Sequence, residues 1–352
     1  MSEPGNLLLQ PPPSPTPALA DPVTVGSLCT GIAGLDLGTA EALGRTRLAW
    51  VADNDPDIAR FLHARFPQVP NLGDLGAVEW RRVEPVDVLT AGFPCEDVSI
   101  SGRGAGIENG ERSGVWARVM DAVRHLRPRL LVVENVAALR WQWKGAGLGP
   151  VLGELAAAGY DAQWHSLRAR DVGAPHARER LFLTAHPRRP RCGPGPLPGG
   201  RAQAPRQAGG PARCGAPPGR DQSRGHLLHP QLHTRAADDG GAALPGSAKA
   251  QAERACALSA PGAWGSGEQA IRRWEHITGR RAPCPLEPGQ RGGRRLSARF
   301  TEWLMGFDEG WISDPALGLS RNAHLRALGR AVVPLQAEAA LHLLLRGEEE
   351  PW

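Results

Sequence analysis

Cys95 and Glu134 are the two side chains whose type and position suggest covalent chemistry. Each follows an apolar run typical of a buried strand, and open α/β sheets bind ligands at the carboxyl ends of their strands. A thiolate nucleophile beside an acid that protonates or holds a ring nitrogen suits attack on an electron-poor heterocycle. A single cysteine is more often buried than nucleophilic, so Glu134 at the same sheet edge is what favours the catalytic interpretation.

Arg178 and Arg180 could add positive charge to the same site. They stand just before the apolar run Leu181–Ala185, and side chains spaced by two residues share one face of an extended chain. Both guanidinium groups are therefore expected to point together toward the strand ends.

A second group of residues has the arrangement of a nucleoside pocket. Cys29, Gly31 and Gly34 lie in a turn between an expected strand and helix, where glycine lets the backbone approach a ligand closely. Asp53 ends the next strand, a position from which a carboxylate can hydrogen-bond a ribose hydroxyl. Asp55 precedes a proline, as a helix N-cap does, so the two aspartates are expected to divide these tasks.

The elements that must position these residues alternate between strand and helix. Apolar runs predict strands at Thr24–Cys29, Arg47–Ala52, Asp87–Ala91, Arg129–Val133 and Leu181–Ala185. Helical periodicity predicts helices at Gly34–Leu43, Asp57–Phe66, Val115–Leu126, Leu148–Ala157, Ile271–Ile277 and Ala337–Leu345, with ordered structure continuing through Phe300–Met305. Buried strands joined by crossover helices define a doubly wound α/β fold with a mostly parallel sheet.

Composition divides the chain into four segments. Residues 1–22, with three consecutive prolines, are expected to be a disordered tail, and residues 23–187 a catalytic domain. Residues 188–295 are expected to be a small, poorly ordered inserted recognition region, because proline and glycine are frequent and no apolar period is visible over most of it. Residues 296–346 are expected to return to the catalytic domain.

Basic charge is concentrated in and next to the inserted region. Residues 188–299 hold 19 Lys+Arg against 7 Asp+Glu, in a chain whose formal net charge is +5. The surplus fits a phosphate-binding module. GC-rich coding explains it equally well, since Lys144 and Lys249 are the only lysines and all other basic residues are arginines.

Other functional classes find no support in the sequence. The six cysteines include no CxxC pair and no histidine cluster has ligand spacing, so no metal site is expected. No apolar run approaches the ~20 residues of a membrane span, and no basic and apolar leader is visible. We expect a cytoplasmic protein, monomeric and without a membrane partner.

Taken in order, these motifs resemble the bacterial and phage cytosine-5 DNA methyltransferases, which depend on S-adenosylmethionine. The shared features are the glycine turn, Asp53, Gly73-Asp74-Leu75, Gly92-Phe93-Pro94-Cys95, Glu134-Asn135-Val136, Arg178-Glu179-Arg180-Leu181-Phe182, Leu296–Phe307 and Ala327–Pro334. The resemblance covers roughly residues 23–187 and 270–346. It implies a methyltransferase Rossmann-like fold and methylation of a cytosine that is flipped out of duplex DNA.

The resemblance implies a role for each catalytic residue. Cys95 attacks carbon 6 of cytosine, while Glu134 holds ring nitrogen 3 and the exocyclic amine. Arg178 and Arg180 support the oxygen at carbon 2 and Glu134.

It also implies a binding mode for S-adenosylmethionine. The turn containing Cys29, Gly31 and Gly34 binds the methionine part of this cofactor. Asp53 binds the ribose and Asp74 the adenine amine. Pro94 and Val115 line the cofactor pocket.

Three positions depart from the family pattern. Glu96 replaces a usual Gln and adds a carboxylate next to Cys95, which is expected to reduce the reactivity of the thiol. His176 also replaces a Gln, at a position that supports the arginines. Arg330 replaces an Asn at a cofactor-facing position, where a long cation beside a sulfonium is unfavourable.

Partners and rival functions follow from the same comparison. Residues 188–295 stand where the family has its target-recognition domain, which implies double-stranded DNA as partner and, in a restriction-modification system, a cognate restriction endonuclease. The stretch 188–262 either folds on DNA or is a frameshifted remnant. The rival functions are a catalytically silent DNA- or cofactor-binding remnant and a transfer-RNA cytosine-5 methyltransferase.

Overall fold

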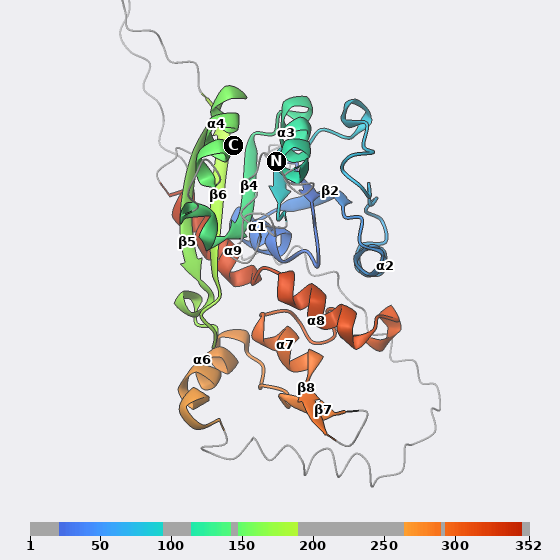
Figure 1. The fold of residues 1–352 in the computed structure, drawn as a ribbon, viewed down its shortest axis with the longest axis vertical. Helices are drawn as coiled ribbons and strands as arrows, with labels where there is room; N and C mark the ends of the chain where they lie inside the picture. Colours follow the sequence, from blue (N-terminus) through green and yellow to red (C-terminus); the bar gives the residue numbers. More distant parts are fainter. Residues whose placement is uncertain (1–20, 94–113, 142–146, 189–263, 290–292, 347–352) are drawn as a thin grey trace, which may run out of the picture.

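The computed structural model describes residues 21–93, 114–141, 147–188, 264–289 and 293–346 of the chain, coloured along the sequence in Figure 1. Six strands form one sheet: β1 (Val23–Leu28), β2 (Thr46–Ala52), β3 (Val88–Ala91), β4 (Leu130–Val136), β5 (Tyr160–Arg168) and β6 (Glu179–Pro187). The helices of the sheet region are α1 (Gly34–Leu43), α2 (Pro56–Arg65), α3 (Gly114–Leu126) and α4 (Leu148–Ala157). The later elements are α6 (Glu268–Thr278), β7 (Leu286–Pro288), β8 (Arg294–Leu296), α7 (Ala298–Leu304), α8 (Arg321–Arg330) and α9 (Pro334–Leu344).

The strand order in the sheet is β2-β1-β3-β4-β6-β5. β2, β1, β3 and β4 pair in parallel, and β6 runs antiparallel to both β4 and β5. The mostly parallel α/β sheet predicted from the sequence is thereby confirmed. β5 was absent from the sequence-based prediction because much of this edge strand is exposed and lacks an apolar run.

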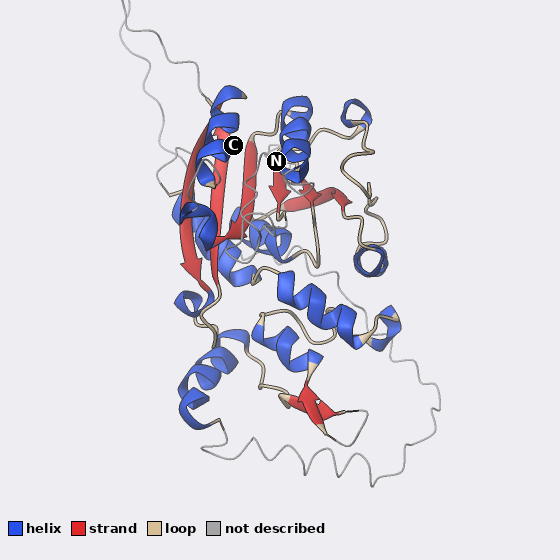
Figure 2. Cartoon of the chain, viewed as in Figure 1, coloured by secondary structure: helices blue, strands red, loops and turns tan. Residues whose placement is uncertain are grey.

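Helices cover both faces of the sheet (Figure 2). On one face α3 and α4 pack through Trp116, Met120 and Leu155 against strand residues that include Leu89 and Leu131. On the other face α1 and α9 cover a second set of strand side chains, Val25, Val88, Leu130, Val132 and Phe182. Alternate residues of the same strands therefore face opposite layers, which is why the strands read as continuous apolar runs.

The C-terminal residues contact the sheet region. α9 packs against α1 and also contacts β5 and β6. A third apolar cluster joins α2 to the segment after α7, where the rings of Phe61 and Trp311 meet edge to face at 5.6 Å. Arg65 Nε donates to the carbonyl oxygen of Trp311 at 2.8 Å, so α2 and the C-terminal segment are joined by polar as well as apolar contacts.

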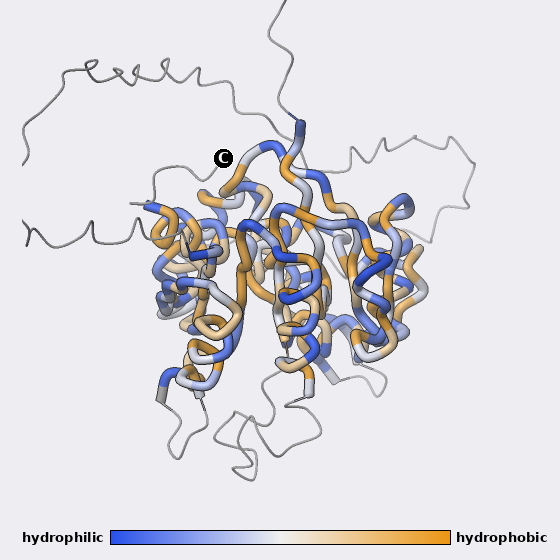
Figure 3. Tube along the Cα trace, turned by 90° about the horizontal axis from the view of Figure 1, so that it is seen from above, coloured by the Kyte–Doolittle hydropathy of each residue, from blue (hydrophilic) through white to orange (hydrophobic). Residues whose placement is uncertain are grey.

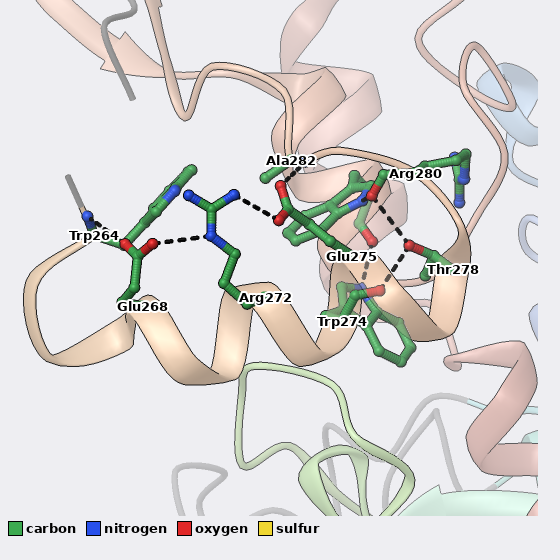
Figure 4. Close-up of polar contacts among 9 residues, drawn as sticks. Trp264, Glu268, Arg272, Trp274, Glu275, Thr278, Arg280 and Ala282 are labelled. Carbon is green, nitrogen blue, oxygen red and sulfur yellow. Dashed lines mark hydrogen bonds and ion pairs between the residues drawn. The ribbon is translucent and has the colours of Figure 1, made fainter. Parts of the chain in front are cut away.

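α6 lies with α7 and the β7–β8 pair beyond one end of the sheet (Figure 1). Figure 4 shows Arg272 of α6 between Glu268 and Glu275, with nitrogen–oxygen distances of 2.9 and 2.8 Å. Trp274 Nε1 donates to the carbonyl oxygen of Trp303 at 2.9 Å, and Arg280 donates to that of Phe307 at 2.7 Å. The last two hydrogen bonds join α6 and the residue Arg280 after it to α7 and the segment that follows α7.

Hydropathy follows this arrangement, with hydrophobic and hydrophilic stretches alternating along the helices around the sheet (Figure 3). Within the described ranges, no helix combines the length and the apolar character needed to cross a membrane. The predicted tail, residues 1–22, and the stretch 188–262 lie almost entirely outside these ranges, so the expectations for them stay predictions.

Candidate active site

A pocket of about 570 Å³ opens at the carboxyl ends of β1, β2, β3 and β4. Its walls include the turn after β1, the end of β2, the ends of β3 and β4, and one face of α8. Ligand sites at this edge are typical of open α/β sheets. All but one of the described residues that the sequence assigned to the site line this pocket: Cys29, Gly31, Gly34, Asp53, Asp74, Val115, Glu134 and Arg180.

The turn after β1 has the tight backbone that its glycines suggested. Cys29, Gly31 and Ala33 all adopt positive φ angles, 51°, 55° and 62°. The N–H of Gly31 donates to Asp53 Oδ2 at 2.9 Å, which ties the turn to the end of β2. Trp311 Nε1 donates to the carbonyl oxygen of Ile32 at 3.0 Å, so the C-terminal segment supports the turn from behind.

Asp55 performs one of the two expected tasks, the helix N-cap, while the ribose-binding role of Asp53 stays a prediction. The Asp55 carboxylate caps α2 by accepting from the N–H groups of Asp57 and Ile58, with Pro56 at the start of the helix. Asp53 lines the pocket and accepts from the backbone of Gly31 and Asp55. Burial raises the pKa of Asp53, and these two hydrogen bonds oppose the shift.

Arg330 of α8 lines the pocket on the side facing Asp53. Its positive charge also acts to lower the pKa of Asp53. The negative charge of Asp53 therefore offsets the positive charge that Arg330 brings to this position.

Asp74 stands at the pocket wall beside a residue that the sequence did not single out. Arg118 of α3 lies with its Nη1 2.9 Å from Asp74 Oδ1, and both side chains are about half exposed. Asp74 Oδ1 also accepts from the N–H of Gly76 at 3.0 Å. Arg118 lies on the turn of α3 that follows Val115, another lining residue, so this wall combines a carboxylate, a guanidinium and an apolar side chain.

Glu134 and Arg180 form a buried ion pair at the other end of the pocket. Arg180 Nε lies 2.7 Å from Glu134 Oε1, and the side chains are 14% and 8% exposed. Burial raises the pKa of Glu134, while the charges of Arg180 and Arg178 act to lower it. The carboxyl is thus held between a low-polarity environment that favours its protonated form and two cations that favour its charged form.

Arg178 lies close to this pair but outside the pocket lining. It donates to the carbonyl oxygen of Ala331 at 2.9 Å, and its buried Nε has no hydrogen-bond partner among the described residues. Burial lowers the pKa of Arg178 to about 10, and the charge of Arg180 acts in the same direction. His176 Nε2 lies 3.2 Å from the carbonyl oxygen of Leu304, so it contacts α7.

Cys95 and Pro94 lie outside the described residues, as do Glu96 and the glycine-rich stretch after it. The described chain ends here at Gly92 and Phe93. A β-carbon built on Gly92 would lie 3.7 Å from Glu134 Oε2, and Asn135 Nδ2 donates to the carbonyl oxygen of Phe93 at 3.4 Å. The segment leading to Cys95 therefore leaves the sheet beside Glu134.

Cys29 is a described cysteine at this edge of the sheet. Burial raises the pKa of its thiol to about 12, and the negative charge of Asp53 adds to the shift. The protonated thiol is a poor nucleophile, so Cys29 acts as part of the pocket wall.

Sequence patterns did not single out Asp36, which lies in the first turn of α1, as a pocket residue. This buried side chain lines the pocket and accepts hydrogen bonds from the hydroxyls of Ser27 and Thr90. A polar residue early in a helix is usually exposed, and only the approach of β1 and β3 buries this one.

Known proteins share this fold and its motifs. The S. pombe Dnmt2 methyltransferase structure has a TM-score of 0.55 at 13% identity and covers 92% of this chain and 98% of that one. A putative DNA modification methyltransferase encoded within an E. coli prophage has a TM-score of 0.51 at 17% identity, covering 92% and 99%. At these identities the likeness concerns the fold alone.

Residues 23–193, just under half of the chain, match the family described as C-5 cytosine-specific DNA methylase. Type II methyltransferase M2.ScrFI of Lactococcus lactis subsp. cremoris is 32% identical over 114 residues, which are 32% of this chain and 32% of that protein. Type II methyltransferase M.NlaX of Neisseria lactamica is 30% identical over 156 residues, 44% of this chain and 50% of that protein. The aligned part thus spans between a third and a half of these relatives.

Proposed function

We propose that this protein transfers a methyl group from S-adenosylmethionine to carbon 5 of cytosine in duplex DNA. The observation that carries the proposal is the buried Glu134–Arg180 pair, which lies beside the chain leading to Cys95 and lines the same pocket as the glycine turn. Glu134, the acid proposed to bind the cytosine, and the residues proposed to bind the cofactor therefore line one pocket.

The pocket residues fit S-adenosylmethionine by their chemistry. Asp53 uses its two oxygens for two backbone N–H groups, and a carboxylate has further lone pairs that accept from ribose hydroxyls. Asp74 can accept from an adenine amine. The tight turn from Cys29 to Gly34 offers close backbone approach to the methionine part. When bound, this cofactor supplies a methyl group activated by its sulfonium.

The chain's own residues perform the remaining steps. We propose that the Cys95 thiolate adds to carbon 6 of the flipped cytosine, which makes carbon 5 nucleophilic, and is expelled when the carbon-5 proton is lost. Glu134 in its protonated form donates to ring nitrogen 3, and its raised pKa favours that form. Extruding the base costs about a few kcal/mol of stacking and pairing.

The two arginines hold the acid and the base in place. Arg180 orients Glu134 through the 2.7 Å ion pair. Arg178 offers a buried Nε–H without a partner in the described part of the chain, and the oxygen at carbon 2 of cytosine is an acceptor that would satisfy it.

We further propose that residues 188–295 contact double-stranded DNA, through the arginine surplus of that segment. A monomer located in the cytoplasm, acting with a cognate restriction endonuclease, agrees with this function. The molar mass in solution, measured by light scattering with and without a DNA duplex, tests the monomer.

The decisive experiment is transfer of labelled methyl from S-adenosylmethionine to DNA of varied sequence. Wild type and a Glu154→Gln control on α4 should label cytosine, and Cys95→Ala should not. Label on transfer RNA in preference to duplex DNA would favour the RNA-modifying alternative. Absence of label with every protein at saturating cofactor would favour the silent remnant and overturn the proposal.

A further inference from the structure

Asp36 is a buried carboxyl group in the pocket wall that the catalytic scheme does not use. Its two oxygens accept from hydroxyls, Oδ2 from Ser27 Oγ at 3.0 Å and Oδ1 from Thr90 Oγ1. Asp36, Ser27 and Thr90 are all buried, so water does little to stabilise a charge on the carboxyl. Burial accordingly raises the pKa of Asp36.

Two other carboxyl groups of this pocket have nearby cations. Glu134 is paired with Arg180, and Asp53 feels the charge of Arg330. No Lys, Arg or His in the described ranges forms an ion pair with Asp36 or opposes its pKa shift. A buried carboxylate is stabilised by a charged partner, and the pocket that Asp36 lines is where such a partner can arrive.

The position of Asp36 indicates which part of the cofactor it would meet. Asp36 is bonded to Thr90, whereas Gly92, two residues further along the chain after β3, adjoins Glu134. The carboxyl thus lies further back along β3 than the site of the cytosine, and Asp74 is the residue already expected to hold the adenine amine. The sulfonium methyl must reach the cytosine, so the group left for Asp36 is the amino-acid end of the methionine part.

We propose that Asp36 is a binding residue that provides the negative counter-charge for the α-ammonium group of S-adenosylmethionine. This proposal rests on the proposed function and deepens it. Ser27 and Thr90 act as positioning residues, because their hydroxyls hold the carboxylate at the junction of β1, β3 and α1.

The test compares three nucleosides on the full chain by calorimetry. S-adenosylmethionine carries the sulfonium and the ammonium, S-adenosylhomocysteine only the ammonium, and 5′-methylthioadenosine neither. Asp36→Asn should weaken both amino-acid-bearing ligands about tenfold or more, since a charge-assisted contact becomes a neutral one, and leave 5′-methylthioadenosine unchanged.

Asn can keep the hydrogen bonds, because it offers an oxygen to one hydroxyl and an amide to the other, so Asp36→Asn should fold. Ser27→Ala removes one hydrogen bond but keeps the charge, and it should preserve the preference for ammonium-bearing ligands. An equal loss for all three nucleosides would assign Asp36 a structural role, and a loss confined to S-adenosylmethionine would assign it to the sulfonium. Either result overturns the proposal. Binding of no nucleoside by wild type would instead contradict the proposed function.

Discussion

The carbonyl oxygen of Val332 occupies the space that a side chain on Gly34 would need. A β-carbon built on Gly34 would lie 2.2 Å from that oxygen, far inside the range of real contacts. Gly34 is the first residue of α1 and the last residue of the turn that begins at Cys29. Val332 lies between α8 and α9. The glycine therefore has a packing reason as well as its expected binding role: it lets the C-terminal segment close onto the turn.

Gly34→Ala should separate these two segments. The obstacle is backbone rather than a flexible side chain, so we expect a loss of about 1–3 kcal/mol in the free energy of unfolding. Cofactor affinity should fall as well. Urea unfolding with and without S-adenosylhomocysteine measures both quantities. The matched control is Gly153→Ala on the exposed face of α4, where nothing lies within 4 Å, and it should be neutral or stabilising by up to about 1 kcal/mol. Equal stability of the two variants would contradict the packing role.

Glu134→Gln should lower the methyl transfer rate by about 10²–10⁴-fold, because an amide cannot deliver a proton. Burial raises the pKa of Glu134, so its protonated form persists to higher pH than that of an ordinary glutamate. In wild type the rate should fall as pH rises through this pKa, and the variant should lack that decline. Single-turnover rates across pH provide the measurement, with Glu154→Gln on α4 as control. An unchanged pH profile in Glu134→Gln would argue against the acid role.

Asp53→Asn should weaken S-adenosylhomocysteine binding about tenfold, since it removes both a ribose acceptor and the carboxylate near Arg330. Arg330→Asn introduced on top of Asp53→Asn should recover part of the loss, because it removes the cation whose charge Asp53 had opposed. A double-mutant cycle by calorimetry should give a coupling of about 0.5–3 kcal/mol. Strictly additive effects would show that the two side chains act independently.

Glu302→Gln should destabilise the C-terminal segment. The buried Glu302 carboxylate accepts from the N–H groups of Gly310, Ile312 and Ser313 and from the Ser313 hydroxyl. The side-chain amide of glutamine would place its N–H donors against groups that themselves donate to Glu302. We therefore expect a loss of about 1–3 kcal/mol in the free energy of unfolding. Chemical denaturation measures it, with the exposed Glu309→Gln as control. A loss no larger than that of the control would exclude this role.

Periodicity and strand-end motifs predicted most of the fold. The strands at 24–29, 47–52 and 87–91 lie within one residue of β1, β2 and β3, and the helix at 148–157 coincides with α4. The three strands are largely buried and α4 has one buried apolar face, so their apolar patterns are clear in the sequence. β5 and α8 were missed because each has much exposed surface, and the pattern of α8 is broken by arginines that face the pocket.

The candidate site was predicted in its strand-end residues and missed where side chains meet from distant segments. The contact between Glu134 and Arg180, which the family resemblance implied, forms because β4 and β6 are neighbours. Arg118 reaches Asp74 from α3, and Asp36 is buried only by β1 and β3. Those contacts depend on tertiary packing, which local sequence patterns do not predict.

The packing of α9 on the sheet has a consequence for synthesis. Residues 23–187 emerge from the ribosome with Val25, Leu130 and Phe182 on a face that α9 has yet to cover. At roughly 5–20 residues per second, the covering helix follows about ten to thirty seconds later. During that interval the nascent chain exposes an apolar surface to solvent. A chain that ends before α9 would keep this surface exposed. Chaperone engagement and proteolysis of such fragments are therefore consequences of the order in which the chain is made.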